Sequence, residues 1–404
     1  MTHPAPGIAR IAFAVSVALA PATLLAQSKS APAKTPIANY WMDVATISLS
    51  IPGAEEMADM PLLGSMMGNY FGGSKLGMVP GKWLDLALYT REKPAGTEGV
   101  HAIPPGQNMG AGLPLLTVPR PVRGGTSPEG TEQQERPKGR LLLYWGCSES
   151  VRPGQPRVLD MATAAPADFA KFFVGRYAPE RGATSAAGHA IWPNEKDKQR
   201  VPANASLQGD HAVTGEGVPA SLKFAIGNQQ DFMEKLKLAA PGDAKSAITA
   251  SWNAVATARA YFLSAVGGTQ SGDMILWSSS DLPEAGLGLM DYLSNAQIDQ
   301  WVKEKVLLSA TTQRCAIPSG IYAEAGGAMV RAIAYGNELN LLHPPRPADP
   351  KALAAWNPEW TLRVRVKSTS MTMLGAEASQ ERQEKKKEEP VNPLDLLKKG
   401  LFGR

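Results

Sequence analysis

The 404-residue sequence contains few of the residues that most often perform catalysis or bind metals, with two cysteines and five histidines. No G-x-S-x-G, H-E-x-x-H, Walker or paired C-x-x-C motif occurs in it. The histidines are scattered along the chain, and no spacing between them matches a known ligand motif. The sequence therefore assigns no catalytic residue and implies neither a cofactor nor a metal centre.

An excess of charge of one sign is also missing. The 41 basic and 37 acidic residues leave a formal net charge of +4, which is small for this length. Nucleic-acid-binding proteins usually concentrate much more positive charge. We therefore expect no nucleic acid as a partner.

Long apolar runs are absent except near the N-terminus, where Arg10 precedes the run from Ile11 to Ala26. This arrangement is typical of a secretory signal peptide, and we expect cleavage after Ala26. A membrane anchor is the alternative, but the run is short for a span and Pro21 interrupts it. The sequence thus predicts a periplasmic or secreted protein.

Glycine and proline are abundant, at 39 and 33 residues, which favours turns and short strands over long helices. We expect a mainly β protein of two packed antiparallel β-sandwich-like domains, with short helices and long Pro/Gly-rich loops. The expected organisation is a signal peptide (1–26), a linker (27–38), an N-terminal β-rich domain (39–235), a second sandwich (236–372) and a charged tail (376–404).

The stretch from Ile248 to Ser280 predicts three consecutive strands, because apolar and polar residues alternate along it and Gly-rich turns interrupt it. Trp252, Tyr261 and Trp277 fall at inward positions, and we expect them to meet in one core. Earlier in the chain, Lys82–Thr90 alternates in the same way. Its two expected faces are Trp83, Asp85, Ala87 and Tyr89 on one side and Leu84, Leu86 and Leu88 on the other.

The Ser251-Trp252 pair, followed by Ala258 and Tyr261, resembles the B and C strands of fibronectin type III domains. Residues 328–335 and 359–367 are similar to the F and G strands of that family. The resemblance covers roughly residues 236–370 and implies a sandwich with a binding role. It carries over no catalytic residue. The chain as a whole resembles secreted bacterial proteins, a likeness that adds no function.

The two cysteines, Cys147 and Cys315, lie at strand-like positions, one in each expected domain. In an oxidising compartment they are candidates for a single disulfide that joins the domains. Two separately buried thiols are the alternative, since a free cysteine packs like a small apolar residue.

Residues 175–217 hold the densest group of polar and aromatic side chains. Histidines and carboxylates brought together there would suit acid–base chemistry, and an exposed tryptophan would suit stacking on a sugar ring or a Pro-rich peptide. An ordinary surface loop is the alternative. The candidate binding residues are His189, Trp192, Asn194, Asp210 and His211.

A Met- and Gly-rich segment between Met57 and Met78 follows neither a helical nor a strand period. Thioether side chains suit soft metals such as Cu(I), although apolar packing is the more common use of methionine. The ligands of such a site would be Met57, Met60, Met66, Met67 and Met78.

The last thirty residues change character, with a mixed-charge run followed by an apolar and basic tip. One helical face of this tip would present Leu394, Leu397, Leu401 and Phe402, among Lys398, Lys399 and Arg404. Such a tip suits a partner's groove or an anionic membrane surface, and a functionless tail is the alternative.

Taken together, these features predict an exported, non-catalytic envelope protein that binds another protein or a polysaccharide. Two alternatives stay open at this point. One is a hydrolase of envelope material that uses the 189–216 loop, and the other is a periplasmic soft-metal binder that uses the Met57–Met78 segment.

Overall fold

The computed structural model describes residues 34–50, 69–76, 79–91, 98–118 and 138–374. Its contacts group Pro36–Arg404 into one unit and Met1–Thr35 into another. The expected signal peptide, the five methionines of the metal hypothesis and the C-terminal tip lie outside the described residues. The mainly β prediction is confirmed, whereas two packed domains are not.

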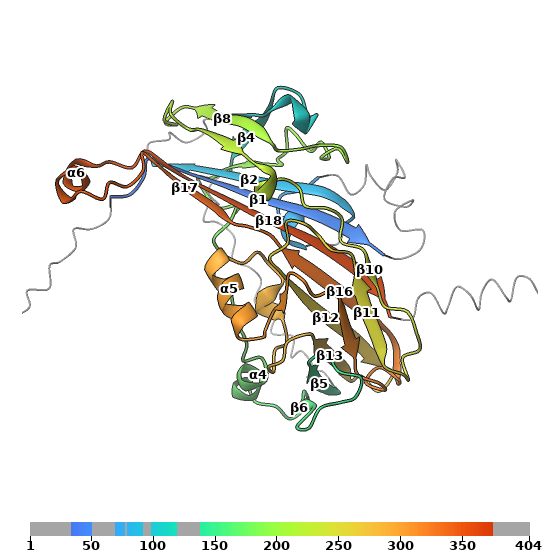
Figure 1. Ribbon diagram of the computed structural model, residues 1–404. Coiled ribbons are helices and arrows are strands. Elements are labelled where there is room, and N and C mark those ends of the chain that lie inside the picture. Colours follow the sequence, from blue (N-terminus) through green and yellow to red (C-terminus); the bar gives the residue numbers. More distant parts are fainter. Residues whose placement is uncertain (1–33, 51–68, 77–78, 92–97, 119–137, 375–404) are drawn as a thin grey trace, which may run out of the picture. The chain divides into compact units, whose positions relative to one another are not determined.

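One long mixed sheet contains most of the strands (Figure 1). Two parallel pairings, β1 with β18 and β5 with β13, insert strands from the first half of the chain beside strands from the second half. The expected boundary near residue 235 therefore does not divide the sheet. The order is β6 (Arg157–Asp160), β5 (Arg140–Trp145), β13 (Met274–Ser278), β12 (Ala260–Thr269), β16 (Ala325–Tyr335), β18 (Trp360–Met373), β1 (Ala38–Leu49), β2 (Gly81–Thr90), β7 (Ala190–Trp192), β4 (Gly112–Thr117), β3 (Gly99–Ala102), β8 (Gly209–Gly215) and β9 (Lys223–Ile226).

Two short strands join this sheet beside its main path, β14 (Leu308–Ser309) on β12 and β17 (Leu339–His343) on β18. A separate three-stranded sheet has the order β10 (Leu238–Ala239), β11 (Ile248–Trp252) and β15 (Arg314–Ile317). The three consecutive strands expected between 248 and 280 are thus present, but the first belongs to the small sheet. Trp252, Tyr261 and Trp277 share one core, as predicted.

Alternation along the central strands gives the long sheet two distinct faces. On β1, Tyr40, Met42 and Val44 point into the main apolar core, and we call this side the core face. Trp41, Asp43 and Ala45 point to the other side, which we call the outer face. The leucines of β2 lie in the same core as Tyr40, so the predicted alternation of Lys82–Thr90 is confirmed.

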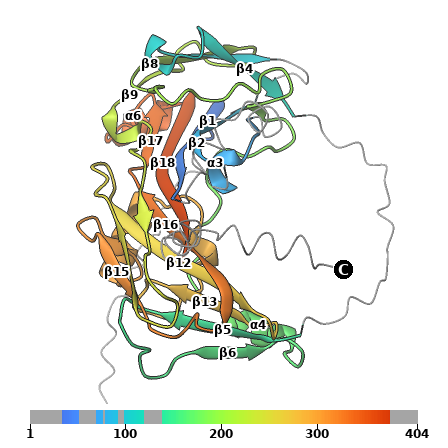
Figure 2. The ribbon, with the colours of Figure 1, turned by 90° about the vertical axis from the view of Figure 1, so that its right-hand side faces the viewer.

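Short helices cover parts of the outer face, and one of them, α3 (Gly73–Leu76), lies beside β1 and β2 in Figure 2. Ile298 and Trp301 of α5 (Asn295–Lys303) pack against Phe262 and Ile333 of the sheet. A capping box begins this helix, because Ser294 caps the Gln297 backbone N–H and the Gln297 side chain accepts from the Ser294 N–H. The other helical segments within the described ranges are η1 (Pro105–Gln107), α4 (Pro166–Phe172), η2 (Asn228–Gln230), η3 (Leu287–Leu289) and α6 (Pro350–Ala355).

Cys147 and Cys315 form a disulfide, with an S–S distance of 2.03 Å and a sequence separation of 168. The bond joins the chain after β5 to β15, and so it links the long sheet to the small one. The pairing predicted from the sequence is confirmed. Within the described residues, no helix is long and apolar enough to cross a bilayer.

Candidate functional site

Charged side chains from three neighbouring strands form a row across the outer face. The register places Arg365 of β18 beside Asp43 of β1, and Asp43 beside Asp85 of β2. All three residues are buried, at 3%, 0% and 0% exposure. A row of charges in the middle of a sheet requires partners on every side, because unpaired buried charge is costly.

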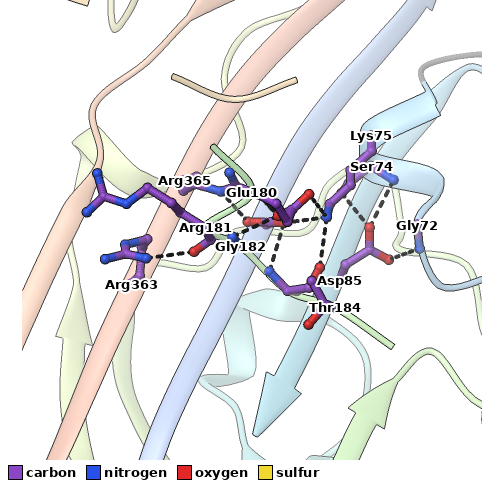
Figure 3. A network of polar contacts seen from close by, with 12 residues as sticks. Gly72, Ser74, Lys75, Asp85, Glu180, Arg181, Gly182, Thr184, Arg363 and Arg365 are labelled. Atoms are coloured by element: carbon purple, nitrogen blue, oxygen red, sulfur yellow. Dashed lines mark hydrogen bonds and ion pairs between the residues drawn. The ribbon is translucent and has the colours of Figure 1, made fainter. Parts of the chain in front are cut away.

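Asp43 and Arg365 satisfy each other with two hydrogen bonds. The Arg365 Nε and Nη2 atoms donate to the two Asp43 carboxylate oxygens at 2.7 and 2.6 Å. The Ala183 backbone N–H donates to Asp43 Oδ2 at 3.1 Å, and Glu180 lies 3.6 Å from Arg365. Residues 180–183 are also bound to the sheet by Arg363, which donates to the Arg181 carbonyl (Figure 3).

Asp85 is held by α3 and the residue before it (Figure 3). The Gly72 and Ser74 backbone N–H groups donate to its two oxygens at 2.9 and 3.1 Å, and the Ser74 hydroxyl donates as well. Burial nevertheless raises the pKa of this carboxyl to about 7, and its hydrogen bonds only partly oppose that shift. Asp85 therefore docks α3 on the sheet.

Lys367, two residues after Arg365, is fully buried on the same face. Its ammonium donates to the Lys75 and Met290 carbonyls at 3.3 and 3.2 Å and lies 4.5 Å from the centre of the Tyr292 ring. Burial lowers the pKa of Lys367 to about 7. Through these contacts Lys367 joins β18 to α3 and to the segment that contains Met290 and Tyr292.

Three aromatic side chains lie together on the outer face beside the charged row. Two of them are on β1 and β2, and the third directly precedes β7. The rings of Trp41 and His189 stack in parallel, with centroids 5.4 Å apart and an interplanar angle of 6°. Tyr89 lies 5.5 Å from His189, and 39% of it is exposed. We call Trp41, Tyr89 and His189 the aromatic surface. Trp41 and His189 are half-buried, so part of each ring also reaches solvent.

Polar side chains lie in the same part of the sheet as the aromatic surface. Asn39 is directly opposite Tyr89 in the β1–β2 register, and Arg363 is directly opposite Trp41 in the β18–β1 register. Both residues are half-buried, and Arg363 pairs with Glu338 at 3.1 Å. Aromatic rings beside amide and guanidinium groups present both apolar ring faces and hydrogen-bond donors.

Burial favours the uncharged form of the His189 imidazole. Burial lowers the pKa of His189, although a contact with the Thr184 carbonyl at 3.1 Å opposes that shift. A neutral ring stacked on Trp41 requires no counter-ion. The aromatic surface therefore suits an uncharged ligand group.

Two other predicted binding residues are used inside the fold. Trp192 is fully buried in the main core, and its indole N–H donates to Asp197 at 2.9 Å. The Asn194 amide donates to the Pro114 and Ile191 carbonyls, both at 2.7 Å. Trp192 and Asn194 thus fix the loop after β7, and the Trp192 ring is not at the surface.

His211 lies on the core face, on the other side of β1 from His189. Tyr40 is 2.9 Å from His101, His101 is 2.9 Å from His211, and His211 is 2.7 Å from the Leu207 carbonyl. The carbonyl accepts a hydrogen bond from His211. With both rings neutral, His101 therefore donates to His211, and the Tyr40 hydroxyl donates to His101. Asp210, next to His211, is exposed.

The five predicted residues therefore do not form one group. His189 belongs to the aromatic surface, Trp192 ends β7 and Asn194 lies in the loop after it, and Asp210 and His211 belong to β8. The sequence did not indicate Trp41 and Tyr89 as partners of His189. The available signal for Tyr89 was its place on the face of the predicted Lys82–Thr90 strand that lies opposite the leucines.

Within the residues that the structure describes, no group of three or more His, Cys, Asp or Glu side chains is arranged to hold a metal ion. Comparisons with protein families, with curated proteins and with solved structures found no match for this chain.

Proposed function

We propose that this chain is an exported, non-catalytic envelope protein that binds another protein or a polysaccharide through the aromatic surface. The observation that carries the proposal is the parallel stack of Trp41 on His189 beside Tyr89, which is 39% exposed. Partly exposed aromatic rings bind the flat apolar faces of sugar rings and of proline. Asn39, directly opposite Tyr89 in the register, offers its amide to the polar edges of the same ligand.

A rigid support favours this use of the surface. Trp41 and Tyr89 belong to the long central strands β1 and β2, and Asp43, two residues after Trp41 on β1, is paired with Arg365 on β18. A site built on paired strands loses little conformational freedom when it binds a ligand. Export is supported by the Cys147–Cys315 disulfide, because such bonds persist in oxidising compartments.

We also propose that residues 236–370 form a fibronectin type III-like sandwich within the larger fold. In immunoglobulin-like sandwiches, strands A, B and E share one sheet while C, F and G share the other. The pairing β10-β11-β15 and the run β13-β12-β16-β18 support this assignment, with β11 as strand B, β12 as C, β16 as F and β18 as G. On this assignment β1 extends the sheet beyond strand G and β5 extends it beyond β13.

The experiment is capture from a bacterial envelope extract by the immobilised protein, with the extract divided into two portions. Proteinase digestion of one portion and periodate oxidation of the other distinguish a protein ligand from a polysaccharide. We expect capture to be lost in one portion and kept in the other. If a Trp41→Ala variant captures as much ligand as the wild type, the ligand does not bind through the aromatic surface. A soluble product released from the extract would contradict the non-catalytic assignment.

A further inference from the structure

Three neighbouring strands place an apolar side chain at the same level of the outer face. The register aligns Val266 of β12 with Met329 of β16, and Met329 with Met373 of β18. Each is partly open to solvent, at 36%, 38% and 37% exposure. Side chains directly opposite one another on adjacent strands are about 5 Å apart, so these three form a continuous strip that we call the apolar row.

Elsewhere the outer face of the same strands is covered. Phe262 and Ile333, further along β12 and β16, are fully buried beneath α5. Met371, two residues before Met373 on β18 and on the same face, is 5% exposed. Solvent exposure therefore rises at the apolar row, and Met274 on the next strand, β13, is 42% exposed.

The chain leaves the described sheet directly beside the apolar row. β1 ends at Leu49, which lies opposite Met371. Among the strands that the structure describes, Met373 therefore pairs with β16 on one side and with none on the other. Leu374 is the last described residue. Residues 375–404 therefore start next to Met373.

We propose that the C-terminal tip, residues 390–404, packs on the apolar row of its own chain. Its apolar residues are spaced as one helical face requires, and they match the three exposed apolar side chains of the row. Two of those side chains are methionines, whose unbranched thioethers adapt to varied partners. The contact residues of the tip are Leu394, Leu397, Leu401 and Phe402.

The connection is long enough for this contact. About twenty residues separate Met373 from Leu394, and a chain of that length spans at most about 70 Å. A tethered segment faces its site at an effective concentration of the order of millimolar, so even weak packing is populated. The contact is independent of the aromatic surface, and its test does not depend on the proposed function.

Methionine oxidation measures the contact directly. We would treat the full chain and a version ended after Gly375 with dilute hydrogen peroxide, and follow Met329 and Met373 by peptide mass spectrometry. Oxidation rates follow the exposure of the sulfur, so we expect both residues to oxidise at least about threefold more slowly in the full chain. Met161, next to β6, should react at the same rate in both proteins.

A full-length variant with Leu394, Leu397, Leu401 and Phe402 changed to Ser keeps the length and charge of the tail, and it should oxidise like the truncated chain. A synthetic 390–404 peptide added to the truncated chain should restore protection in a saturable way. Equal rates in all three proteins would overturn the proposal. Protection that increases with protein concentration would overturn it too, because a second copy would then cover the row.

Discussion

Asp43 on β1 and Arg365 on β18 are direct partners in the parallel register, although 322 residues separate them in the sequence. Their two hydrogen bonds, at 2.7 and 2.6 Å, join β1 to β18, which are the first and last described strands in sequence order. The pair lies between the aromatic surface and Lys367 on the outer face. It therefore fixes the strands on which the proposed binding site is built.

Asp43→Ala should destabilise the protein by about 3–5 kcal/mol, because it leaves the buried Arg365 guanidinium without its carboxylate. Chemical denaturation monitored by tryptophan fluorescence gives the free energy of unfolding. Lys196→Ala is the control, since Lys196 pairs with Glu98 at the surface with 54% of its side chain exposed. We expect no more than about 1 kcal/mol for this control. Equal losses for the two variants would show that the buried pair is not special.

Gly182→Ala should also destabilise the protein, by roughly 1–3 kcal/mol, because the new Cβ would collide with the Arg365 and Asp43 side chains. The matched control is Gly227→Ala, where the new Cβ meets nothing within 4 Å. Thermal unfolding of both variants makes the comparison. A Gly182→Ala protein as stable as the control would mean that the 180–184 segment does not press on the ion pair.

Lys367 makes stability depend on pH. Its pKa is about 7 in the folded protein and 10.5 when unfolded, so between these values the unfolded chain binds more protons. Stability should therefore rise with pH across that window, by about 2 kcal/mol between pH 7.5 and 9.5. Lys367→Met should remove this rise, whereas Lys223→Met, at an exposed position of β9, should keep it. Parallel curves for wild type and Lys367→Met in urea titrations would rule out the effect.

Reduction of the Cys147–Cys315 disulfide should lower the free energy of unfolding by about 2–5 kcal/mol, because the bond closes a 168-residue loop in the unfolded chain. Denaturation with and without dithiothreitol measures the change. The double variant Cys147→Ala/Cys315→Ala should resemble the reduced protein and should not respond to the reductant. A response of that variant would point to an effect of dithiothreitol unrelated to the bond.

Much of the local structure could be predicted from the sequence. Alternation placed Asp85 and Tyr89 on one face of β2 and the leucines on the other. The disulfide was one of two hypotheses for a chain with two cysteines, which allow a single pairing. These features depend on residues close in sequence or on a single possible pairing.

Strand order could not be predicted in the same way. Nothing in the local pattern of β1 indicates that it pairs in parallel with β18, and that pairing brings Asp43 to Arg365 and Trp41 beside Arg363. Trp192 appeared to be a surface residue because polar neighbours surround it in sequence, yet it fills the core. Burial of such a residue is decided by contacts between distant segments, which the sequence does not display.

The most direct test of the aromatic surface compares ligand capture by Tyr89→Ala and Tyr177→Ala. Tyr177 is a matched control, because it is also a surface tyrosine, with 59% exposure against 39% for Tyr89. The account predicts that Tyr89→Ala reduces the retained envelope ligand about tenfold, as the loss of an aromatic contact at a hot spot does, while Tyr177→Ala retains it like wild type. Undiminished capture by Tyr89→Ala, with both variants folded, would contradict the proposed binding function at this surface.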